Sequence, residues 1–386
     1  MQFKSIRLLN ACDVYQPKTI ATKYFVPDGK YTVYGANGEI GQYDEYNHEE
    51  PEVLMACRGA TCGTINVSKP FSWINGNAMV IHPNGTVPLR KDYLKYYLMS
   101  VSKDSIISGT AQPQITRQNL KDFQIVICDL DDQQKIVSQI EESLSQLNNA
   151  VETLNKTKQQ LEIYRQAVLK EAFDGILTNS GKAKEDILKN YIEKPKYGTS
   201  KKCSYLDDDT YKPVYRIPNI NTKTARIVHT DIKYAHFEKK ELETIRLQNN
   251  DLLIIRSNGS VSLVGRVALV TDDDTQGTFA GYLMRLRIIN QQMLFPKYLL
   301  WYLQSKSARE YIESKAKSTS GVNNINSEEI SNLTIPYYNL QSQKAIVEAI
   351  ESRISIFDSI QQVVTTSLQR AEALRQSVLK QAFEGK

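Results

Sequence analysis

The stretch YRQAVLKEAFDG at Tyr164–Gly175 returns as LRQSVLKQAFEG at Leu374–Gly385, and 8 of the 12 positions are identical. The two stretches lie 210 residues apart, and the same offset relates apolar residues further upstream, such as Ile136 and Ile346. Self-similarity at a fixed offset is the signature of a repeated architecture. We therefore predict that the chain is two copies of one plan, each a globular part followed by a helix.

A long helix is predicted to end each copy. In the first copy, residues 133–174 contain neither Pro nor Gly and are rich in Gln, Glu, Lys and Leu, which favour helices. Gly175 and Gly385 stand where a glycine is expected to terminate each helix, and Asp131 or Asp132 could cap the start of the first. At ~1.5 Å per residue, such a helix is a rod about 60 Å long.

Each predicted helix carries one apolar seam, in which apolar residues recur every seven positions. Because a single helix cannot bury such a seam, we expect the two helices to pack as an antiparallel coiled coil. The alternative is two separate helices, each lying on its own globular domain. The seam residues are Leu147, Val151, Leu154, Leu161 and Val168 in the first helix and Phe357, Val364, Ala371 and Val378 in the second.

The globular parts have the pattern of mixed β and α structure. Short runs of Val, Ile, Tyr and Thr are separated by Asn-Gly, Pro and Gly, which is typical of strands joined by tight turns. A short helical stretch follows in each part, DYLKYYLMSVS at Asp92–Ser102 and PKYLLWYLQSKSAREYIESKA at Pro296–Ala316. We therefore expect an α/β (α+β) fold, in which two pseudo-repeated mixed-sheet domains are joined by the two long helices.

The domain boundaries follow from this pattern. We expect a first domain, a first helix, a second domain that opens with a polar linker, and a second helix. Their ranges are 1–130, 131–175, 176–340 with the linker at 176–195, and 341–386.

Length and composition bound the class of protein. The 386 residues are 24% charged and 41% hydrophobic, which excludes a disordered or collagen-like chain. No apolar run approaches the ~20 residues of a membrane span, and the start MQFKSIRLLN lacks the features of a signal peptide, so we expect a cytoplasmic protein. Five scattered cysteines without a CxxC pair predict reduced thiols, with neither a disulfide framework nor a zinc site.

Motifs for catalysis are missing. The chain has no Pro-Pro pair, so the Asn/Asp/Ser-Pro-Pro-aromatic motif of nucleic-acid amino-methyltransferases is absent. GILTNSGK at Gly175–Lys182 has the wrong spacing for a phosphate-binding loop, and neither HExxH nor GxSxG occurs. We therefore predict no catalytic, cofactor-binding or metal-binding residues, and a protein that is not an enzyme.

Two loops carry side chains suited to DNA. Arg58–Gly63 (RGATCG) and Arg256–Ser260 (RSNGS) follow matching apolar strands, and both loops could present guanidinium and amide donors. Arg and Asn pair with the edges of guanine and adenine. The net charge of +5 is concentrated in 176–340, which carries +6 and would attract a polyanion. The alternative is that Gly and Asn only shape the turns and that the arginines are solvated.

These features together resemble the specificity subunit of type I restriction-modification enzymes. The resemblance rests on the repeated plan, on YGANGEIGQYDEY with RGATCGTIN, on SGTAQPQITRQNLKDFQI and on the LRQSVLKQAFEG ending, and it covers essentially the whole chain. In that family, two target recognition domains each read one half of a bipartite site on double-stranded DNA. The resemblance implies a non-catalytic partner of DNA methyltransferase subunits, two per chain, and of restriction (nuclease) subunits where these are present. It implies no cofactor and no membrane.

The resemblance also relates the two copies to each other. GVNNINSEEISNLTIP at Gly321–Pro336 matches the QPQITRQNLKDFQIV loop of the first copy. One departure concerns the joint between the first domain and its helix, where the family commonly has Pro-Leu-Pro and this chain has Ile127-Cys128-Asp129. That departure predicts a less rigid joint.

The residues that contact DNA are expected in or beside the turns that follow strands and that both copies share, because such turns present side chains from a rigid scaffold. They are Arg58, Thr61, Asn75, Asn77 and Gln114 in the first domain and Arg216, Asn219, Lys223, Arg256, Asn258 and Asn323 in the second, with Lys201 and Lys202 as phosphate contacts. Two other functions stay open. One is a stand-alone DNA methyltransferase or nuclease, and the other is a coiled-coil scaffold that binds only protein.

Overall fold

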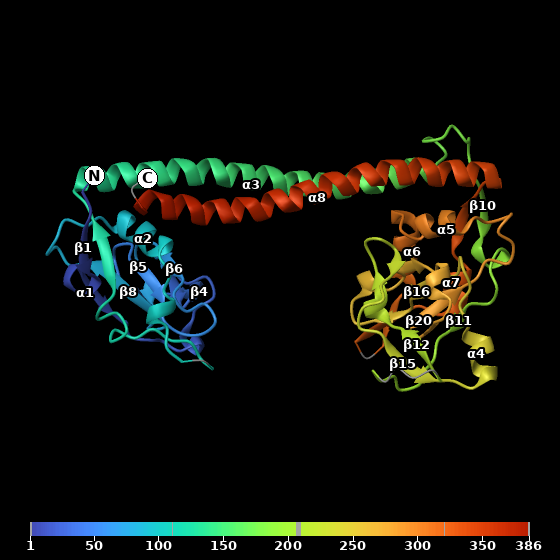
Figure 1. The fold of residues 1–386 in the computed structure, drawn as a ribbon, viewed down its shortest axis with the longest axis horizontal. Coiled ribbons are helices and arrows are strands. Elements are labelled where there is room, and N and C mark those ends of the chain that lie inside the picture. Colours follow the sequence, from blue (N-terminus) through green and yellow to red (C-terminus); the bar gives the residue numbers. More distant parts are fainter. Residues whose placement is uncertain (1, 110, 206–209, 320, 385–386) are drawn as a thin grey trace. The chain divides into compact units, whose positions relative to one another are not determined.

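The computed structural model describes residues 2–109, 111–205, 210–319 and 321–384. The chain folds into two compact units (Figure 1). Unit 1 consists of Met1–Lys156 and Val364–Lys386, and unit 2 consists of Thr157–Val363. Each unit therefore combines one globular domain with parts of two long helices.

The domain of unit 1 is built on three small sheets (Figure 1). An antiparallel sheet has the order β2-β8-β5-β6, a second sheet has the order β4-β3-β7, and β1 pairs with β9. The strands are β1 (Lys4–Arg7), β2 (Cys12–Tyr15), β3 (Tyr31–Gly35), β4 (Gly38–Tyr43), β5 (Val53–Ala56), β6 (Ile65–Val67), β7 (Trp73–Ile74), β8 (Ala78–Pro83) and β9 (Gln124–Ile127). The helices are α1 (Leu8–Ala11) and α2 (Lys91–Ser100).

Strand β5 shows how the sequence positions this core. Its residues Val53–Ala56 are all buried, as expected for a strand covered on both faces. Because alternate side chains point to opposite faces, Met55 belongs to the cluster that includes Leu94 of α2, whereas Leu54 belongs to the cluster with Tyr34 of β3. The core of the domain therefore lies on both sides of β5.

The domain of unit 2 repeats this plan with a larger sheet. Its six strands have the order β11-β20-β16-β18-β14-β13, and smaller sheets have the orders β15-β12-β19, β17-β22-β21 and β10-β23. The strands are β10 (Lys184–Ile187), β11 (Lys196–Tyr197), β12 (Tyr211–Tyr215), β13 (Ile220–Asn221), β14 (Arg226–Ile227), β15 (Lys233–His236), β16 (Leu252–Ile255), β17 (Ser257–Asn258), β18 (Val267–Leu269), β19 (Thr278–Phe279), β20 (Leu283–Leu286), β21 (Lys317–Thr319), β22 (Val322–Asn324) and β23 (Thr334–Tyr337). The helices are α4 (Lys239–Ile245), α5 (Pro296–Tyr302), α6 (Lys306–Lys315) and α7 (Ser327–Ser331). Strand β16 is buried along its whole length, like β5.

The segment 176–195, which the sequence suggests is a linker, is folded into unit 2. It contains β10, which pairs with β23 through Lys184 and Tyr337. Tyr191 and Ile192 in the same segment are buried. The polar segment therefore forms part of a two-stranded sheet with β23 and is not an extended linker.

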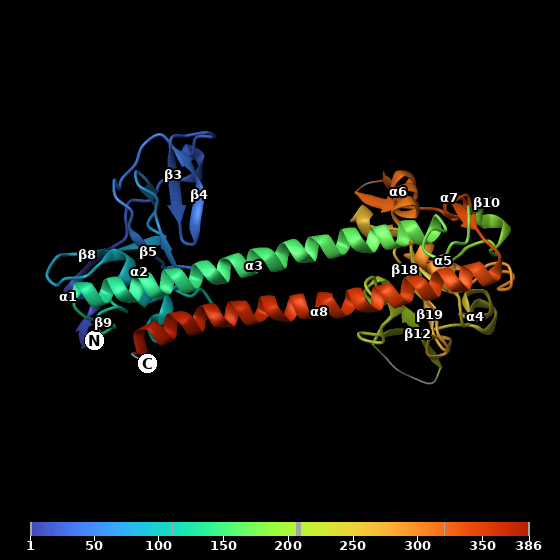
Figure 2. The ribbon, with the colours of Figure 1, turned by 90° about the horizontal axis from the view of Figure 1, so that it is seen from above.

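Two long helices contribute residues to both units: α3 spans Leu130–Phe173 and α8 spans Leu340–Glu384. In unit 1 the start of α3 packs against the end of α8, where Ile136 and Leu379 share a buried cluster. In unit 2 the end of α3 packs against the start of α8, where Arg165 lies 5.7 Å from the ring centroid of Phe357. Within each unit the two helices therefore run antiparallel and side by side (Figure 2), as the seams predict.

The ends of α3 test the predicted helix signals. The side-chain oxygen Oδ1 of Asp129 accepts a hydrogen bond from the backbone N–H of Asp132 at 2.8 Å, so the helix starts before residue 133. The prediction that Asp131 or Asp132 is the cap is wrong, because both lie inside the helix. At the other end Gly175 has a φ of 75°, the left-handed conformation that commonly ends a helix, as predicted. Gly385 lies outside the described residues.

The predicted seam residues differ in burial. Leu147, Val168, Phe357, Val364 and Ala371 are buried, and Val151, Leu154, Leu161 and Val378 are half-buried. Leu379, which the seven-residue spacing does not include, is fully buried. A straight helix has 3.6 residues per turn, so a strict seven-residue spacing drifts around its surface by about 20° per heptad. The buried stripe has therefore moved from Val378 to Leu379 at the end of α8.

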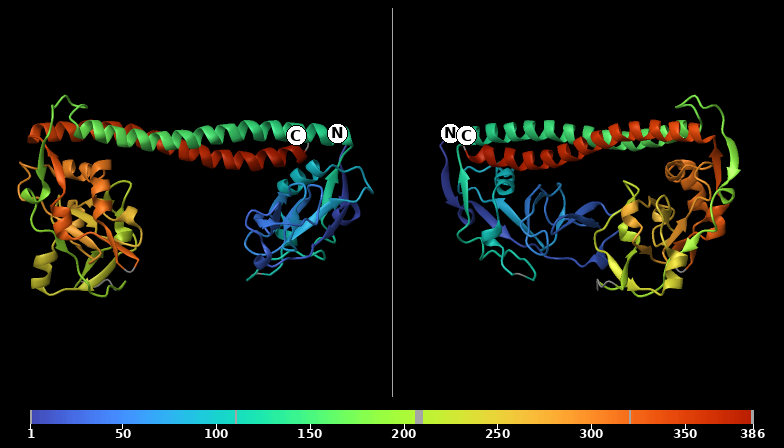
Figure 3. Two further views of the ribbon diagram at one scale, coloured as in Figure 1. Left: turned by 180° about the vertical axis from the view of Figure 1, so that it is seen from behind. Right: turned by 45° about the vertical axis from the view of Figure 1, so that its right-hand side comes forward.

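Each long helix ends on the domain of the other copy (Figure 3). In unit 1, Phe383 of α8 makes an edge contact with Tyr93 of α2, and the ring centroids are 5.2 Å apart. In unit 2, Phe173 of α3 makes the same contact with Tyr298 of α5, also at 5.2 Å. Phe383 and Phe173 are repeat partners, so both units are completed by an exchanged helix end.

A buried glutamine ties each domain to the helix that follows it. The amide nitrogen Nε2 of Gln133 donates to the carbonyls of Pro88 and Cys128 at 2.9 and 2.8 Å, and its Oε1 accepts from the N–H of Arg90 at 2.9 Å. Its repeat partner Gln343 makes the same three kinds of hydrogen bond in unit 2. Both glutamines are fully buried. Although it lacks Pro-Leu-Pro, the first joint is therefore held by the same hydrogen bonds as the second.

Candidate nucleic-acid interface

Both units place the loop after their central strand against a second loop that precedes the long helix. In unit 1 the N–H of Ile115 donates to the carbonyl of Cys57 at 3.0 Å, and in unit 2 the N–H of Ile325 donates to the carbonyl of Arg256 at 2.9 Å. Ile115 and Ile325 are repeat partners. The paired loops are therefore built on the same backbone scaffold in both units.

This scaffold sets the correspondence between the two copies. Cys57 and Arg256 hold equivalent places, because their carbonyls accept equivalent hydrogen bonds. The residues that follow, Arg58 and Ser257, are equivalent as well, since both pair with the second loop at matching positions. Arg58 and Arg256 are therefore offset by one residue on this shared scaffold. Adjacent residues of an extended segment point to opposite sides, so the two arginines face different surroundings.

Three of the predicted DNA contacts of unit 1 lie together on its surface. Arg58 and Gln114 face each other across an isolated β-bridge. The carbonyl of Asn77 accepts a hydrogen bond from the N–H of Cys57, beside Arg58, at 3.1 Å. All three predicted contacts are exposed, whereas Thr61 in the same loop is half-buried. The loops thus offer one guanidinium and two amides to solvent.

Two predicted contacts are buried instead. The Oδ1 of Asn75 accepts from the N–H of Ile20 at 2.9 Å, and its Nδ2 donates to the carbonyl of the same residue at 3.3 Å. Asn219 is fully buried, and its Nδ2 donates to the carbonyl of Thr230 at 2.8 Å while its Oδ1 accepts from the N–H of Arg216 at 2.9 Å. Asn amides often bond neighbouring backbone and so fix turns. Direct contact with DNA is therefore the wrong role for Asn75 and Asn219, which shape the loops.

Several predicted contacts of unit 2 converge on a pocket of about 720 Å³. Arg216, Arg256 and Lys201 line it, together with three residues that the sequence did not single out, Tyr197, Lys233 and Tyr282. Cationic and aromatic side chains thus meet on one concave surface.

The guanidinium of Arg256 forms part of the wall of this pocket. It lies over the ring of Tyr197, 4.4 Å from the centroid, where a cation is attracted by the ring. Its Nη1 donates to the carbonyl of Gly281 at 3.1 Å. These two contacts hold the planar group in place before any ligand arrives.

Two other cations of the pocket are paired with carboxylates. Arg216 Nη2 lies 2.8 Å from Asp231 Oδ2, and Lys201 Nζ lies 2.6 Å from Glu241 Oε2. Hydrogen bonds from Tyr205 and Arg216 lower the pKa of Asp231, and the hydrogen bond from Lys201 lowers the pKa of Glu241. Both carboxylates therefore stay ionised at neutral pH and hold their cationic partners in position.

Asn258 and Asn323 lie on neighbouring strands, β17 and β22, and both are half-buried. The Nδ2 of Asn323 donates to the carbonyl of Gly259 at 2.9 Å, and the Oδ1 of Asn258 accepts from the N–H of Ser260 at 2.9 Å. Part of each amide therefore shapes this turn, as the alternative interpretation of the loop predicts.

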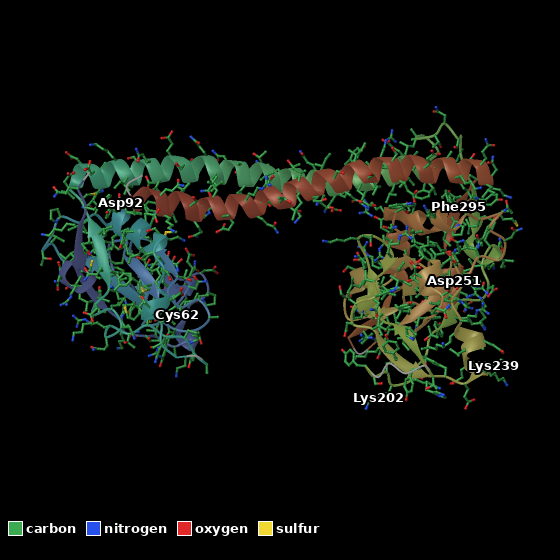
Figure 4. All side chains as sticks on the ribbon, viewed as in Figure 1. Cys62, Asp92, Lys202, Lys239, Asp251 and Phe295 are labelled. Atoms are coloured by element: carbon green, nitrogen blue, oxygen red, sulfur yellow. The ribbon has the colours of Figure 1, made fainter. Side chains whose placement is uncertain are left out.

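The two other lysines predicted to contact DNA, Lys223 and Lys202, lie outside the pocket. Lys223 is exposed in the turn between β13 and β14, at the edge of the six-stranded sheet opposite β11. Lys202 is exposed as well, and Figure 4 shows it with Lys239 at the end of the domain that lies away from the long helices α3 and α8. The structure thus brings Lys201 to the pocket and leaves its neighbour Lys202 on the open surface.

The sequence gives little sign of Tyr197, Lys233 and Tyr282, because they come from separate segments that only the folded chain brings together. Tyr197 reaches the pocket through the pairing of β11 with β20, and Tyr282 immediately precedes β20. The available signal in the sequence is that Tyr282 is an aromatic residue that follows Gly281 just before an apolar run. In the structure 63% of the surface of Tyr282 is exposed.

Within the described ranges, no cluster of three or more His, Cys, Asp or Glu side chains is arranged to hold a metal ion. Among the same residues, no helix has the length and apolar character needed to cross a membrane.

The chain resembles known specificity subunits in sequence. The model of the family "Type I restriction modification DNA specificity domain" matches residues 2–163 and 185–366. The type I restriction enzyme StySPI specificity subunit of Salmonella potsdam is 26% identical over 339 residues, which are 85% of this chain and 68% of that protein. The EcoKI specificity subunit of Escherichia coli strain K12 is 26% identical over 298 residues, which are 74% of this chain and 63% of that protein. The chain thus spans about two thirds of the length of these relatives.

Solved structures show the same fold. A chain from a structural study of complex assembly and conformational transition of the type I R-M system has a TM-score of 0.72, with 16% identity and coverage of 99% of this chain and 97% of that one. The HsdS subunit from Thermoanaerobacter tengcongensis has a TM-score of 0.54 at the same identity and coverage. With a family model that matches both copies of the repeat, the chain belongs to the type I restriction-modification DNA specificity family.

Proposed function

We propose that this chain is the DNA-recognition subunit of a type I restriction-modification complex. The domains at 1–130 and 176–340 each read one half of a bipartite site on double-stranded DNA. The helices at 131–175 and 341–386 join the two domains and bind two methyltransferase subunits, with restriction subunits as further partners in the cytoplasm. The chain itself is not an enzyme and carries no cofactor, since the reaction belongs to its partners.

The observation that carries this proposal is the shared loop scaffold of the two units. The hydrogen bonds of Ile115 and Ile325 give both units the same backbone frame, and the residues on that frame differ. Cys57 stands where the second copy has Arg256, and Arg58 stands where it has Ser257. Two equal frames that carry unlike side chains suit the reading of two unlike half-sites, because base contacts determine sequence preference.

An exposed apolar stripe on α8 supports a protein partner. Ile356, Ile360 and Val363 are all exposed, and their spacing of four and three residues places them on one face of the helix. Exposed apolar patches commonly mark sites of protein contact. In the proposed complex, a methyltransferase subunit binds this stripe of α8.

Exchange of one domain tests the division of labour. Replacing residues 1–130 by those of another family member should change one half of the bipartite methylation motif and leave the other half as it was, because each domain carries its own pair of loops and the exchange leaves the second domain and both long helices unchanged. Methylome sequencing of a host with the native chain, with the hybrid and with neither measures both halves at once. A motif that changes in both halves, or in neither, contradicts the proposal.

The same measurements separate the other candidate functions. S-adenosylmethionine bound to the isolated chain, or metal-dependent cleavage by it, would identify a methyltransferase or nuclease. A chain that binds the methyltransferase but gives the complex no preference for any DNA sequence would be a scaffold.

Substitutions in unit 2 distinguish base contacts from phosphate contacts. Arg256→Ala should weaken binding of the cognate duplex by about 1–3 kcal/mol and relax one position of the motif. Lys202→Ala should weaken the binding of cognate and scrambled duplexes alike. It should also reduce the slope of log affinity against log salt concentration by about 1, the contribution of one phosphate contact. Titration of both duplexes at two salt concentrations with the complete complex measures the difference. If neither substitution alters either affinity, the loops only shape the fold.

A further inference from the structure

The pocket of unit 2 is a concave site. Side chains that read base edges, by contrast, project from the protein surface into a groove of the DNA. Its volume of about 720 Å³ falls in the range of about 300–1,000 Å³ typical of pockets for small ligands. We propose that it receives one nucleotide that leaves the base stack of the bound DNA. This inference rests on the proposed function and adds a second mode of recognition to it.

The walls suit a flat ring. The guanidinium of Arg256 is already stacked near the ring of Tyr197, and unstacked bases bind on aromatic faces and on Arg planes. Tyr282 stands at the rim with 63% of its surface exposed. Its ring is therefore available to cover a base that enters.

Backbone without side chains lines another part of the pocket. Gly198 and Gly281 lie there, on segments that pack closely through the bridge between Thr199 and Ala280. A Cβ atom at Gly198 would meet the carbonyl of Phe279 at 2.1 Å, so only glycine fits at that position. The two glycines therefore allow the two backbone segments that form this part of the wall to pack closely together.

The charge of the pocket suits a phosphate. Lys201 and Arg216 are neutralised by Glu241 and Asp231. By contrast, no carboxylate among the described residues forms an ion pair with Lys233 or Arg256, and Lys233 lies over the ring of Tyr205 at 4.7 Å. The pocket therefore offers positive charge beside aromatic surface, which is the chemistry of a nucleotide.

Unit 1 differs at the decisive position. Cys57 holds the place of Arg256 there and is fully buried, so the guanidinium wall has no counterpart. The structure therefore assigns nucleotide capture to the half-site that unit 2 reads.

A mismatch series tests this assignment. Extruding a base costs least when its pair is already weakened, so a mismatch at the captured position should tighten binding, whereas mismatches at other positions should weaken it. We expect one position in the half-site of unit 2, other than the methylated base, at which a mismatch tightens binding by the complete complex about tenfold. Tyr282→Ala should abolish that tightening. Tyr24→Ala, which removes a comparably exposed ring from unit 1, should preserve it.

The outcomes separate this inference from the proposed function. Cognate duplex preferred over scrambled duplex, with every mismatch weakening binding, overturns nucleotide capture and leaves DNA recognition standing. Equal binding of cognate and scrambled duplexes overturns the proposed function itself. Tightening that survives Tyr282→Ala, in a variant that melts like the wild type, excludes this pocket. If deoxynucleoside monophosphates bind to the free chain and the mismatch series is flat, the pocket serves a soluble nucleotide and the inference is overturned.

Discussion

Leu379→Asp is expected to unfold the joint between α8 and the domain of unit 1. Leu379 is fully buried in the cluster that contains Ile136, Ile140 and Tyr93. Replacing it with Asp removes this packing and places a carboxylate where water does not reach. The expected loss is at least about 3 kcal/mol of the free energy of unfolding, from lost apolar contacts and from an unpaired buried charge.

Leu374→Asp is the matched control, because it makes the same change five residues earlier on the same helix. Leu374 is 52% exposed, so the control should stay within about 0.5 kcal/mol of the wild type. Urea denaturation followed by circular dichroism measures both variants. Equal stability of Leu379→Asp and the wild type would show that α8 does not complete the core of unit 1.

Gln133→Ala is expected to have the next largest effect. The substitution leaves the carbonyls of Pro88 and Cys128 and the N–H of Arg90 without the partner that Gln133 supplies. A buried polar group without a partner costs about 1–3 kcal/mol, so the expected destabilisation is about 3 kcal/mol or more. Because these hydrogen bonds join the domain to α3, the variant should also show faster amide exchange in the first turns of that helix.

The neighbouring glutamine supplies the control. Gln134 is exposed, and Gln134→Ala should be neutral or slightly stabilising, since Ala is the best helix former. Gln343→Ala should reproduce the effect of Gln133→Ala in unit 2. A Gln133→Ala variant as stable as Gln134→Ala would mean that water replaces the lost side chain at no cost.

The sequence predicts the parts of the fold that depend on periodic pattern. The repeat, the long helices and their seams can be recognised in the sequence, because residues at equivalent positions of the two copies are buried in the same way and therefore have similar side chains. The start of α3 was missed because Asp129, Asp131 and Asp132 are chemically alike, and only the geometry shows which of them caps the helix.

The candidate site is predicted less completely, for a physical reason. Asn75 and Arg256 belong to similar polar turns in the sequence, but one amide is buried against Ile20 while the other side chain borders a pocket. Which way a loop side chain faces depends on a register of one residue, because Arg58 of the first copy occupies the place of Ser257 in the second and not that of Arg256. Tyr282 could not be predicted, because its neighbours in the pocket are distant in the chain.

The exchange of helix ends has a consequence for biosynthesis. Tyr93 of the first domain is translated 290 residues before Phe383, which packs on it. At about 5–20 residues per second, the apolar surface of α2 waits roughly 10–50 s before its cover is translated. During that delay the nascent chain carries a first domain with exposed apolar surface, to which chaperones would bind. A premature stop codon just before Leu379 would therefore also destabilise the first domain, because Leu379 belongs to its buried cluster.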